Sequence, residues 1–374
     1  MSIKIKEVVS KSDFKTFIYL PEKIHQNHKN WVHPLYIDEE KFFNKDKNPA
    51  FKNNETIMLL AYENQEPVGR IMGIIPTDFN ASNQVKTARF SYFECYERKD
   101  IFDALLKEVE TWAREKGCNQ IIGPMGFSDK EPQGFLTSGF EELHMPVTNH
   151  TFGYMKNYTL ENAYTPYVEL CQYEVPLTKD LPQTYEIFVQ RVLRNHRIKI
   201  QEFTSTKEIK PFVKGVFELI NSTYTDIYGF TKVSEEEANE FANRFLPLLN
   251  PKLIKILTND ENKVIAFVIA MPNINEGIKK AKGRLFPFGW YHIFQSMRKS
   301  KRLVLLLGGV QNEMQNKGLD AILALKLISS ALELGFTILD SHLIMKENAK
   351  MRGTIERIAN YKMYKEYTIF SKPL

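Results

Sequence analysis

The stretch with the clearest potential for chemistry runs from residue 302 to residue 335. The apolar run 303–307 is short and ends at two glycines, which predicts a buried strand. A polar loop, 311–317, follows, and the apolar repeat over 320–334 predicts a helix buried on most of its surface. A strand, a loop and a helix N-terminus in this order present free backbone N–H groups to an anion. Gly318 allows a ligand to approach the backbone closely there.

The segment 309–321, GVQNEMQNKGLDA, resembles the acyl-CoA-binding segment of the GCN5-related N-acetyltransferase (GNAT) superfamily. That family shows Q/R-x-x-G-x-G/A after its fourth strand, and Gln315, Gly318 and Asp320 occupy the three fixed places. Asp320 departs from the pattern, because an acid suits the helix dipole but competes with a phosphate for it. The resemblance implies that backbone N–H groups hold the pyrophosphate of acetyl-CoA or a longer acyl-CoA, and that an N–H near Val310 meets the oxyanion. The coenzyme-binding residues that it implies are Val310, Gln315, Asn316, Lys317, Gly318, Leu319, Asp320, Ala321 and Asn348.

Acyl transfer to an amine also requires a proton acceptor, because an amine with a pKa of about 10 is mostly protonated at pH 7. Glu347 and His342, near the predicted fifth strand of the second half, are the candidates, and each also fits a structural role. In GNAT proteins an Asn opens the next helix, and often a Tyr seven residues later protonates the leaving thiolate. Asn348 matches the first, but Ile355 stands in the second place. Tyr361 and Tyr364 are candidate replacements, although aromatic residues near a chain end commonly belong to the core.

The first half alternates strands and helices in the order of one GNAT unit. Its loop 92–100 stands where the pyrophosphate loop should be, but contains no glycine and carries three acids that repel phosphate. We therefore expect no coenzyme in this half. The loop 126–139 is expected either to form part of the wall of an acceptor site or to be a solvated surface loop. The predicted strands are 3–8, 56–62, 68–75, 88–97, 120–122 and 167–175, and the predicted helices are 13–24 and 101–116.

The order repeats from residue 177 onward, which predicts two tandem units, 1–176 and 177–374. The fold class expected is α/β, with a mixed sheet in each GNAT-like unit. The second unit contains the coenzyme motif. Its predicted strands are 198–203, 253–258, 264–271, 303–307, 337–343 and 367–370, and its predicted helices are 209–221, 235–245, 320–334 and 348–359.

Length and composition are those of an ordinary globular chain large enough for two cores, with 374 residues of which 43% are hydrophobic. No apolar stretch reaches the length of a membrane span, and the first residues lack a signal-peptide core, so a cytoplasmic location is expected. The three cysteines and eight histidines show no metal-ligand spacing, so no metal is expected. A net charge of +5 is compatible with an anionic ligand, but many proteins without such a ligand have a similar charge. No pattern indicates nucleic-acid binding.

The segment 279–302 is an insertion with eight Lys or Arg residues, no acid and an apolar, aromatic centre. Three interpretations remain open. It is a helix packed on its own domain, a lid over an acyl chain, or an interfacial helix that makes a peripheral membrane contact through 285–297.

The function expected is acyl-CoA-dependent N-acyl transfer to a small-molecule amine or amino-acid-like acceptor. Three alternatives remain. A purely structural or interaction protein is the least favoured of them, because the loop before Asp320 would then have no reason for its shape. A catalytically degenerate GNAT protein would bind acyl-CoA without transferring the acyl group, as Ile355 allows. A lipid-active acyltransferase at the membrane surface would account for the insertion.

Overall fold

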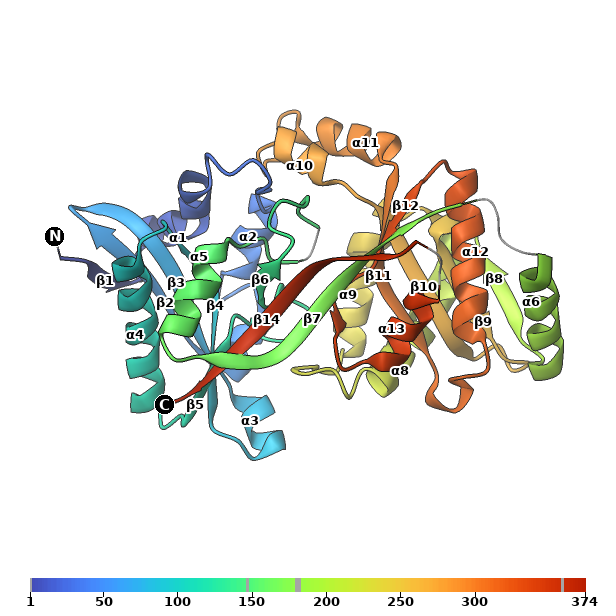
Figure 1. Ribbon diagram of the computed structural model, residues 1–374, viewed down its shortest axis with the longest axis horizontal. Helices are drawn as coiled ribbons and strands as arrows, with labels where there is room; N and C mark the ends of the chain where they lie inside the picture. Colours follow the sequence, from blue (N-terminus) through green and yellow to red (C-terminus); the bar gives the residue numbers. More distant parts are fainter. Residues whose placement is uncertain (1, 146–147, 179–182, 358–359) are drawn as a thin grey trace. The chain divides into compact units, whose positions relative to one another are not determined.

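The computed structural model describes residues 2–374 except 146–147, 179–182 and 358–359, and contains two compact units (Figure 1). The sequence suggested a single boundary after residue 176, whereas the structure assigns two later segments to the first unit. The insertion joins unit 1 because the Tyr36 N–H donates to the Gly283 carbonyl at 3.0 Å and Arg284 pairs with Glu22 at 2.8 Å. Unit 1 comprises Met1–Cys171, Ile274–Ser296 and Tyr364–Leu374, and unit 2 comprises Gln172–Asn273 and Met297–Met363.

Unit 1 is built on a mixed sheet with strand order β1-β2-β3-β4-β5-β14-β7, to which β7 contributes its first part. Alternate residues of its strands point to opposite faces. Leu59 and Ile71 pack with α4, whereas Leu60 and Met72 pack with α1 and α2. The strands are β1 (Lys4–Glu7), β2 (Asn54–Glu63), β3 (Glu66–Pro76), β4 (Thr87–Cys95), β5 (Gln120–Gly123), β6 (Phe135–Ser138), β7 (Thr165–Pro176) and β14 (Lys362–Pro373).

Local sequence explains the helices of unit 1. Ser10 and Asp13 form a capping box at the start of α1, with both hydrogen bonds at 3.1 Å. Gly117, with φ of 78°, follows the end of α4 in the left-handed conformation that glycine adopts easily. The helices are α1 (Lys11–Ile24), α2 (Tyr36–Phe42), η1 (Pro49–Asn53), α3 (Thr77–Asn83), α4 (Lys99–Glu115), α5 (Gly153–Glu161), α10 (Asn275–Lys280) and most of α11 (Gly289–Lys299).

Unit 2 repeats this plan with strand order β7-β12-β11-β10-β9-β8, to which β7 contributes its last part. The helix α12 packs on β9 and β10, and α8 and α9 pack over the cluster that contains Ile254, Ile256 and Phe267. β9 and β10 form a hairpin that turns at Asn262, with φ of 60°. The strands are β8 (Lys199–Glu202), β9 (Ile254–Thr258), β10 (Val264–Pro272), β11 (Arg302–Val310), β12 (Ile338–Asp340) and β13 (Ile344–Met345).

The helices of unit 2 also follow their sequence signals. Ser234 and Glu237 form a capping box at the start of α9. No helix in the described part of the chain is both long and apolar enough to cross a membrane. The helices are α6 (Gln183–His196), α7 (Thr206–Ile209), η2 (Lys210–Phe212), α8 (Val213–Thr223), α9 (Glu235–Phe245), η3 (Leu246–Leu248), η4 (Pro251–Leu253), η5 (Asn312–Met314), α12 (Leu319–Glu333) and α13 (Ala349–Glu356).

Candidate active site

Two parallel strands of unit 2 diverge, which opens one edge of β11. β11 and β12 pair only over the three residues from Arg302 to Val304, opposite Ile338–Asp340. β11 then continues to Val310, and among the described strands it pairs there with β10 alone. Backbone N–H and C=O groups on an edge without a partner strand are available to a ligand.

A β-bulge lies where the strands diverge. Ile269 of β10 faces Leu307 of β11, whereas the next residue, Ala270, faces Leu305. Leu306 is therefore the additional residue of β11. A bulge bends its strand and re-aims the neighbouring groups, and it is common beside active sites.

Beyond the bulge, the register fixes which backbone groups of β11 face the open edge. The Gln311 N–H donates to the Ile265 carbonyl at 2.8 Å, so Ala266 and Val310 form a non-hydrogen-bonded pair. The Val310 N–H therefore points away from β10, toward the open edge. Because the pattern alternates along the strand, the N–H and C=O of Gly308 point the same way.

The Tyr224 hydroxyl lies on this edge. It donates to the Gly308 carbonyl at 2.9 Å, and its oxygen accepts the Gly308 N–H at 3.3 Å. Tyr224 follows directly after α8, and its ring centroid is 6.0 Å from that of Phe230. The arrangement places a proton donor beside the open backbone of β11. The sequence did not single out this residue, because a tyrosine in a polar loop carries no motif.

The loop between β11 and α12 ends at Gly318, which is the N-cap of the helix and has φ of 84°. This left-handed conformation is open to glycine and strained for most other residues. The first intrahelical bond runs from the Ile322 N–H to the Gly318 carbonyl at 3.1 Å. The N–H groups of the residues before Ile322 thus have no acceptor within the helix, and no side chain caps them. This end of α12 has the donors that an anion needs.

Side chains brace the same loop. The Gln315 amide donates to Asn312 at 2.9 Å and accepts from the Lys350 ammonium at 3.1 Å. Asp320, which departs from the family pattern, accepts a hydrogen bond at 3.0 Å from the Thr354 hydroxyl on α13. One oxygen of its carboxylate is thereby directed to α13.

The predicted catalytic residues lie in different places. His342 is half-buried between β12 and β13, and burial lowers the pKa of its ring. Glu347 is exposed, and its carbonyl accepts the Ala349 N–H at 2.8 Å. The Asn348 side chain caps α13 by accepting the Met351 N–H at 3.0 Å. These residues belong to unit 2.

Tyr364 belongs to unit 1 instead. It lies on β14 with 6% of its surface exposed, and the Lys365 ammonium lies 5.4 Å from its ring centroid. Its side chain is buried in unit 1.

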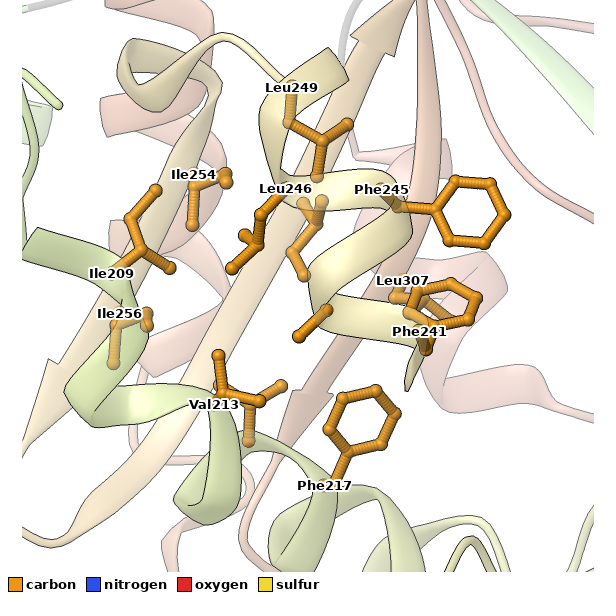
Figure 2. A pocket seen from close by; sticks show the side chains of 13 residues that line it. Ile209, Val213, Phe217, Phe241, Phe245, Leu246, Leu249, Ile254, Ile256 and Leu307 are labelled. Atoms are coloured by element: carbon orange, nitrogen blue, oxygen red, sulfur yellow. The ribbon is translucent and has the colours of Figure 1, made fainter. Parts of the chain in front are cut away.

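An apolar pocket lies between α8, α9 and the sheet of unit 2 (Figure 2). Its empty volume is about 480 Å3, part of it open to solvent. The rings of Phe217, Phe241 and Phe245 lie on one side of it, with centroid separations of 5.9 and 4.4 Å between neighbours. Leu307, which follows the bulge residue of β11, is also part of the lining. The pocket therefore extends to β11, the strand whose edge is open after Val304.

Two curated proteins are similar to the chain over nearly their whole length, and no family model matches it. The bacterial ceramide synthase of Caulobacter vibrioides strain NA1000 / CB15N is 25% identical over 386 residues, which cover 100% of this chain and 98% of that protein. The protein YghO of Escherichia coli strain K12 is 26% identical over 384 residues, which cover 99% of this chain and 95% of that protein.

Solved structures show the same architecture. A tandem GNAT protein from the clavulanic acid biosynthesis pathway covers 100% of this chain and 98% of its own, with a TM-score of 0.57 and 10% identity. The chain has a tandem GNAT fold. A GCN5-related N-acetyltransferase from Anabaena variabilis, which covers 99% of this chain and 72% of its own, has a TM-score of 0.50 and 9% identity. The mixed α/β fold expected from the sequence is thus confirmed.

A GNAT fold supports acyl transfer in general and suggests an acyl-CoA cosubstrate. Ile355, at the place of the tyrosine that often serves as the acid in this family, is 5% exposed and belongs to the core. Among the described residues, no group of three or more His, Cys, Asp or Glu side chains is arranged to hold a metal ion.

Proposed function

We propose that the protein transfers an acyl group from acyl-CoA to the amine of a long-chain amino alcohol. The observation that carries the proposal is the open edge of β11, with an apolar pocket at the same strand. Similarity over the whole chain to a bacterial ceramide synthase supports this acceptor, since a ceramide is the amide of a fatty acid and a long-chain amino alcohol. The tandem GNAT fold supports the acyl-CoA donor.

In this proposal the N-terminus of α12 binds the pyrophosphate, and the thioester lies along the open edge of β11. The Val310 N–H points toward that edge and would donate to the oxyanion of the tetrahedral intermediate. The amine nitrogen forms a bond to the carbonyl carbon, and the carbon–sulfur bond breaks. The Tyr224 hydroxyl would protonate the departing thiolate, since it lies beside the same backbone. His342 and Glu347 stay the candidates of unit 2 for accepting the amine proton.

The apolar pocket is proposed to hold a hydrocarbon chain. Ala242 lines it with a small side chain on α9. Ala242→Phe should fill the pocket and shift the preference toward shorter chains, with a loss of about fourfold in kcat/KM for each methylene that no longer fits. A series of acyl-CoA lengths and a series of amino-alcohol lengths would show which chain the pocket takes. Equal selectivity of variant and wild type in both series would remove the pocket from the proposal.

The segment 285–297 is proposed to contact an anionic membrane surface from which a lipid acceptor can be drawn. Its aromatic side chains are about half to three-quarters exposed, and Lys280, Lys282 and Lys299 beside it are exposed. Exposed aromatic rings flanked by lysines suit the interface of a bilayer that carries negative charge. The exposed aromatic residues are Phe286, Phe288, Trp290, Tyr291 and Phe294.

Fluorescence of Trp290 tests this contact, after Trp31 and Trp112 are changed to Phe. A blue shift with phosphatidylglycerol vesicles that weakens with salt is expected, because salt screens the lysines. A blue shift with long-chain acyl-CoA alone would indicate a lid over an acyl chain instead. If neither addition changes the emission, the segment is a helix packed on unit 1 and the membrane contact is wrong.

The function itself is tested by incubating the full chain with acyl-CoA and a long-chain 2-amino-1,3-diol. Release of free thiol together with an amide product in the mass spectrum is expected. Amide formed only with small amines or amino acids would overturn the long-chain acceptor. Stabilisation by acyl-CoA without any amide would favour the degenerate, coenzyme-binding alternative.

A further inference from the structure

Three histidines of unit 1 gather around one phenylalanine, and a fourth packs against one of the three, outside the site described above. His28 stacks on Phe152 with a centroid distance of 3.8 Å, and His25 lies 5.1 Å from the same ring. His150 lies 5.5 Å from Phe152 and 5.3 Å from His144. The residues come from the end of α1 and from the segment before α5. Distant parts of the sequence thus build one polar cluster in the unit that lacks a coenzyme loop.

A chain of hydrogen bonds links three members of this unit. The Glu94 carboxylate lies 2.5 Å from His25 Nε2, and His25 Nδ1 lies 2.9 Å from His28 Nδ1. Burial alone would raise the pKa of Glu94, but the adjacent His25 and the Arg70 guanidinium hold it below the usual value, so the carboxylate is charged. His25 then donates from Nε2 to Glu94 and accepts at Nδ1 from His28. This tautomer leaves a lone pair on Nε2 of the half-buried His28.

His150 is an independent sign of a ligand. Its side chain is 5% exposed, and within the described chain neither of its ring nitrogens has a hydrogen-bond partner. Burial lowers the pKa of this ring to about 2, so it is neutral and carries one donor and one acceptor. Each buried polar atom without a partner costs about 1–3 kcal/mol. A hydroxyl group, which both donates and accepts, would satisfy either side of the ring.

We propose that this cluster binds the polar end of an amino alcohol, and that His28 takes a proton from its ammonium group. The ligand class rests on the proposed function. The N–H bond of the ammonium breaks, its electron pair stays on nitrogen, and the proton forms a bond with His28 Nε2. The products of this step are a neutral amine and an imidazolium. The imidazolium stays on His28, where the hydrogen bond to His25 and the negative charge of Glu94 stabilise it, and His150 forms a hydrogen bond with a hydroxyl of the same ligand.

The charges around His28 determine how its protonation depends on pH. Burial first, and then the neighbouring His25, lower the pKa of His28, while Glu94 of β4 and Glu97, which follows that strand, oppose them. His144, His150 and Lys365 of β14 face the same cluster. His28 is therefore neutral at pH 7, as a proton acceptor must be. Its capacity to accept is lost only as pH falls through its lowered pKa.

The first test is binding, which needs no catalytic turnover. In NMR spectra of the full chain, 2-aminooctane-1,3-diol should shift the ring signals of His28 and His150 in a saturable way. Octane-1,3-diol, which lacks the amine, should leave the His28 signal unchanged. If the amino diol shifts neither ring, the proposal is wrong even where the protein forms amides. If it binds but no amide forms with any acyl-CoA, the proposed function fails and this site stands.

The second test is the pH profile of amino-diol binding. The affinity should fall as pH falls through the lowered pKa of His28, because an imidazolium repels the ammonium group of the ligand. His28→Gln should weaken binding on the order of 10-fold at pH 7 and remove this pH dependence. Glu94→Gln, which keeps a hydrogen-bond acceptor, should shift the acid limb of the profile. His33→Gln, a change to a half-buried histidine of the same unit outside the chain of bonds, should match wild type. A His28→Gln profile parallel to wild type would reduce the cluster to a structural one.

Discussion

The two units contain the same divergence of strands, but only one keeps it open. β4 and β5 pair over 87–89 and 120–122, as β11 and β12 do over their first three residues. In unit 1 the chain after β5 returns along the edge, where the Met125 N–H donates to the Phe90 carbonyl at 2.9 Å. The Arg89 guanidinium adds bonds to two carbonyls of this loop. Unit 1 thus fills with its own backbone the edge that has no partner strand in unit 2.

The helices that follow these strands show the same contrast, because the N-terminus is occupied by side chains in unit 1 and uncapped in unit 2. Only three residues separate β4 from α4, and Arg98 at the N-cap of α4 pairs with Glu63 and with Asp100 in the first turn. α12 begins after the loop 311–318, with Gly318 at its N-cap and no side-chain cap. In unit 2 the N-terminus of α12 therefore keeps free backbone N–H groups that suit an anion. In unit 1 the ion pairs of Arg98 occupy the corresponding N-terminus of α4.

The largest effect should come from Gly318→Glu. A non-glycine residue at φ of 84° is strained, and its carboxylate repels phosphate, so acyl-CoA affinity should fall more than 100-fold. Thermal shift and calorimetric titration with acetyl-CoA measure this loss. Gly117→Glu, at φ of 78° in unit 1, adds the same strain and charge and should reduce stability but not affinity. Equal losses in both variants would place the coenzyme elsewhere.

Much of the fold was predictable because local signals agree with it. The hairpins, the helix before Gly117 and the strand–loop–helix of the coenzyme motif follow from periodicity and turn residues. Of the predicted strand 337–343, only residues 338–340 form a strand, β12, and the short β13 follows beyond the predicted range. Of the predicted helix 348–359, residues 349–356 form α13, while 358–359 lie outside the described residues. Among the elements without a prediction, α2 and α3 are short, with seven residues each, whereas the 14-residue α6 was missed although its apolar residues recur at helical spacing.

The composition of the sites was less predictable, because it depends on contacts between distant residues. The motif residues around Gly318 carry a local pattern, whereas Tyr224 meets Gly308 across 84 positions of sequence. His25 and Glu94 are 69 positions apart. The assignment of the segment 274–296 to unit 1 has the same cause, since no periodicity encodes which unit an insertion packs against.

Tyr224→Phe should have the next largest effect, because it removes the hydroxyl from the open edge of β11 and keeps the ring. We expect kcat to fall about 100-fold, with acyl-CoA binding unchanged, since the proton is needed only as the thiolate leaves. Steady-state kinetics and calorimetric titration separate the two quantities. Tyr361→Phe, which removes the hydroxyl of another candidate, an exposed tyrosine of the same unit, should leave kcat unchanged. If kcat is unchanged in Tyr224→Phe, the role of acid returns to the other candidates.

Two glycine substitutions sharpen the contrast between a filled and an open edge. A Cβ on Gly123 would lie 2.4 Å from the Phe90 carbonyl oxygen, whereas the nearest atom to a Cβ on Gly308 is 3.5 Å away. Gly123→Ala should therefore reduce the free energy of unfolding by about 1–3 kcal/mol, and Gly308→Ala should leave it nearly unchanged. Urea denaturation of both variants measures the difference. Similar values would mean that the edge of unit 1 is not tightly filled.

The smallest effect is expected for Asp100→Asn, which tests whether α4 takes any part in coenzyme binding. The Arg98 side chain keeps two hydrogen bonds to Glu63, at 2.7 and 3.0 Å, so the loss of one exposed partner should change stability by less than about 1 kcal/mol. If α4 were a second phosphate site, removal of a negative charge from its first turn would strengthen acyl-CoA binding. Calorimetric titration should instead give an affinity within about twofold of wild type. A clear gain in affinity would show that the two helix N-termini share the ligand, and that the contrast between the units is one of degree.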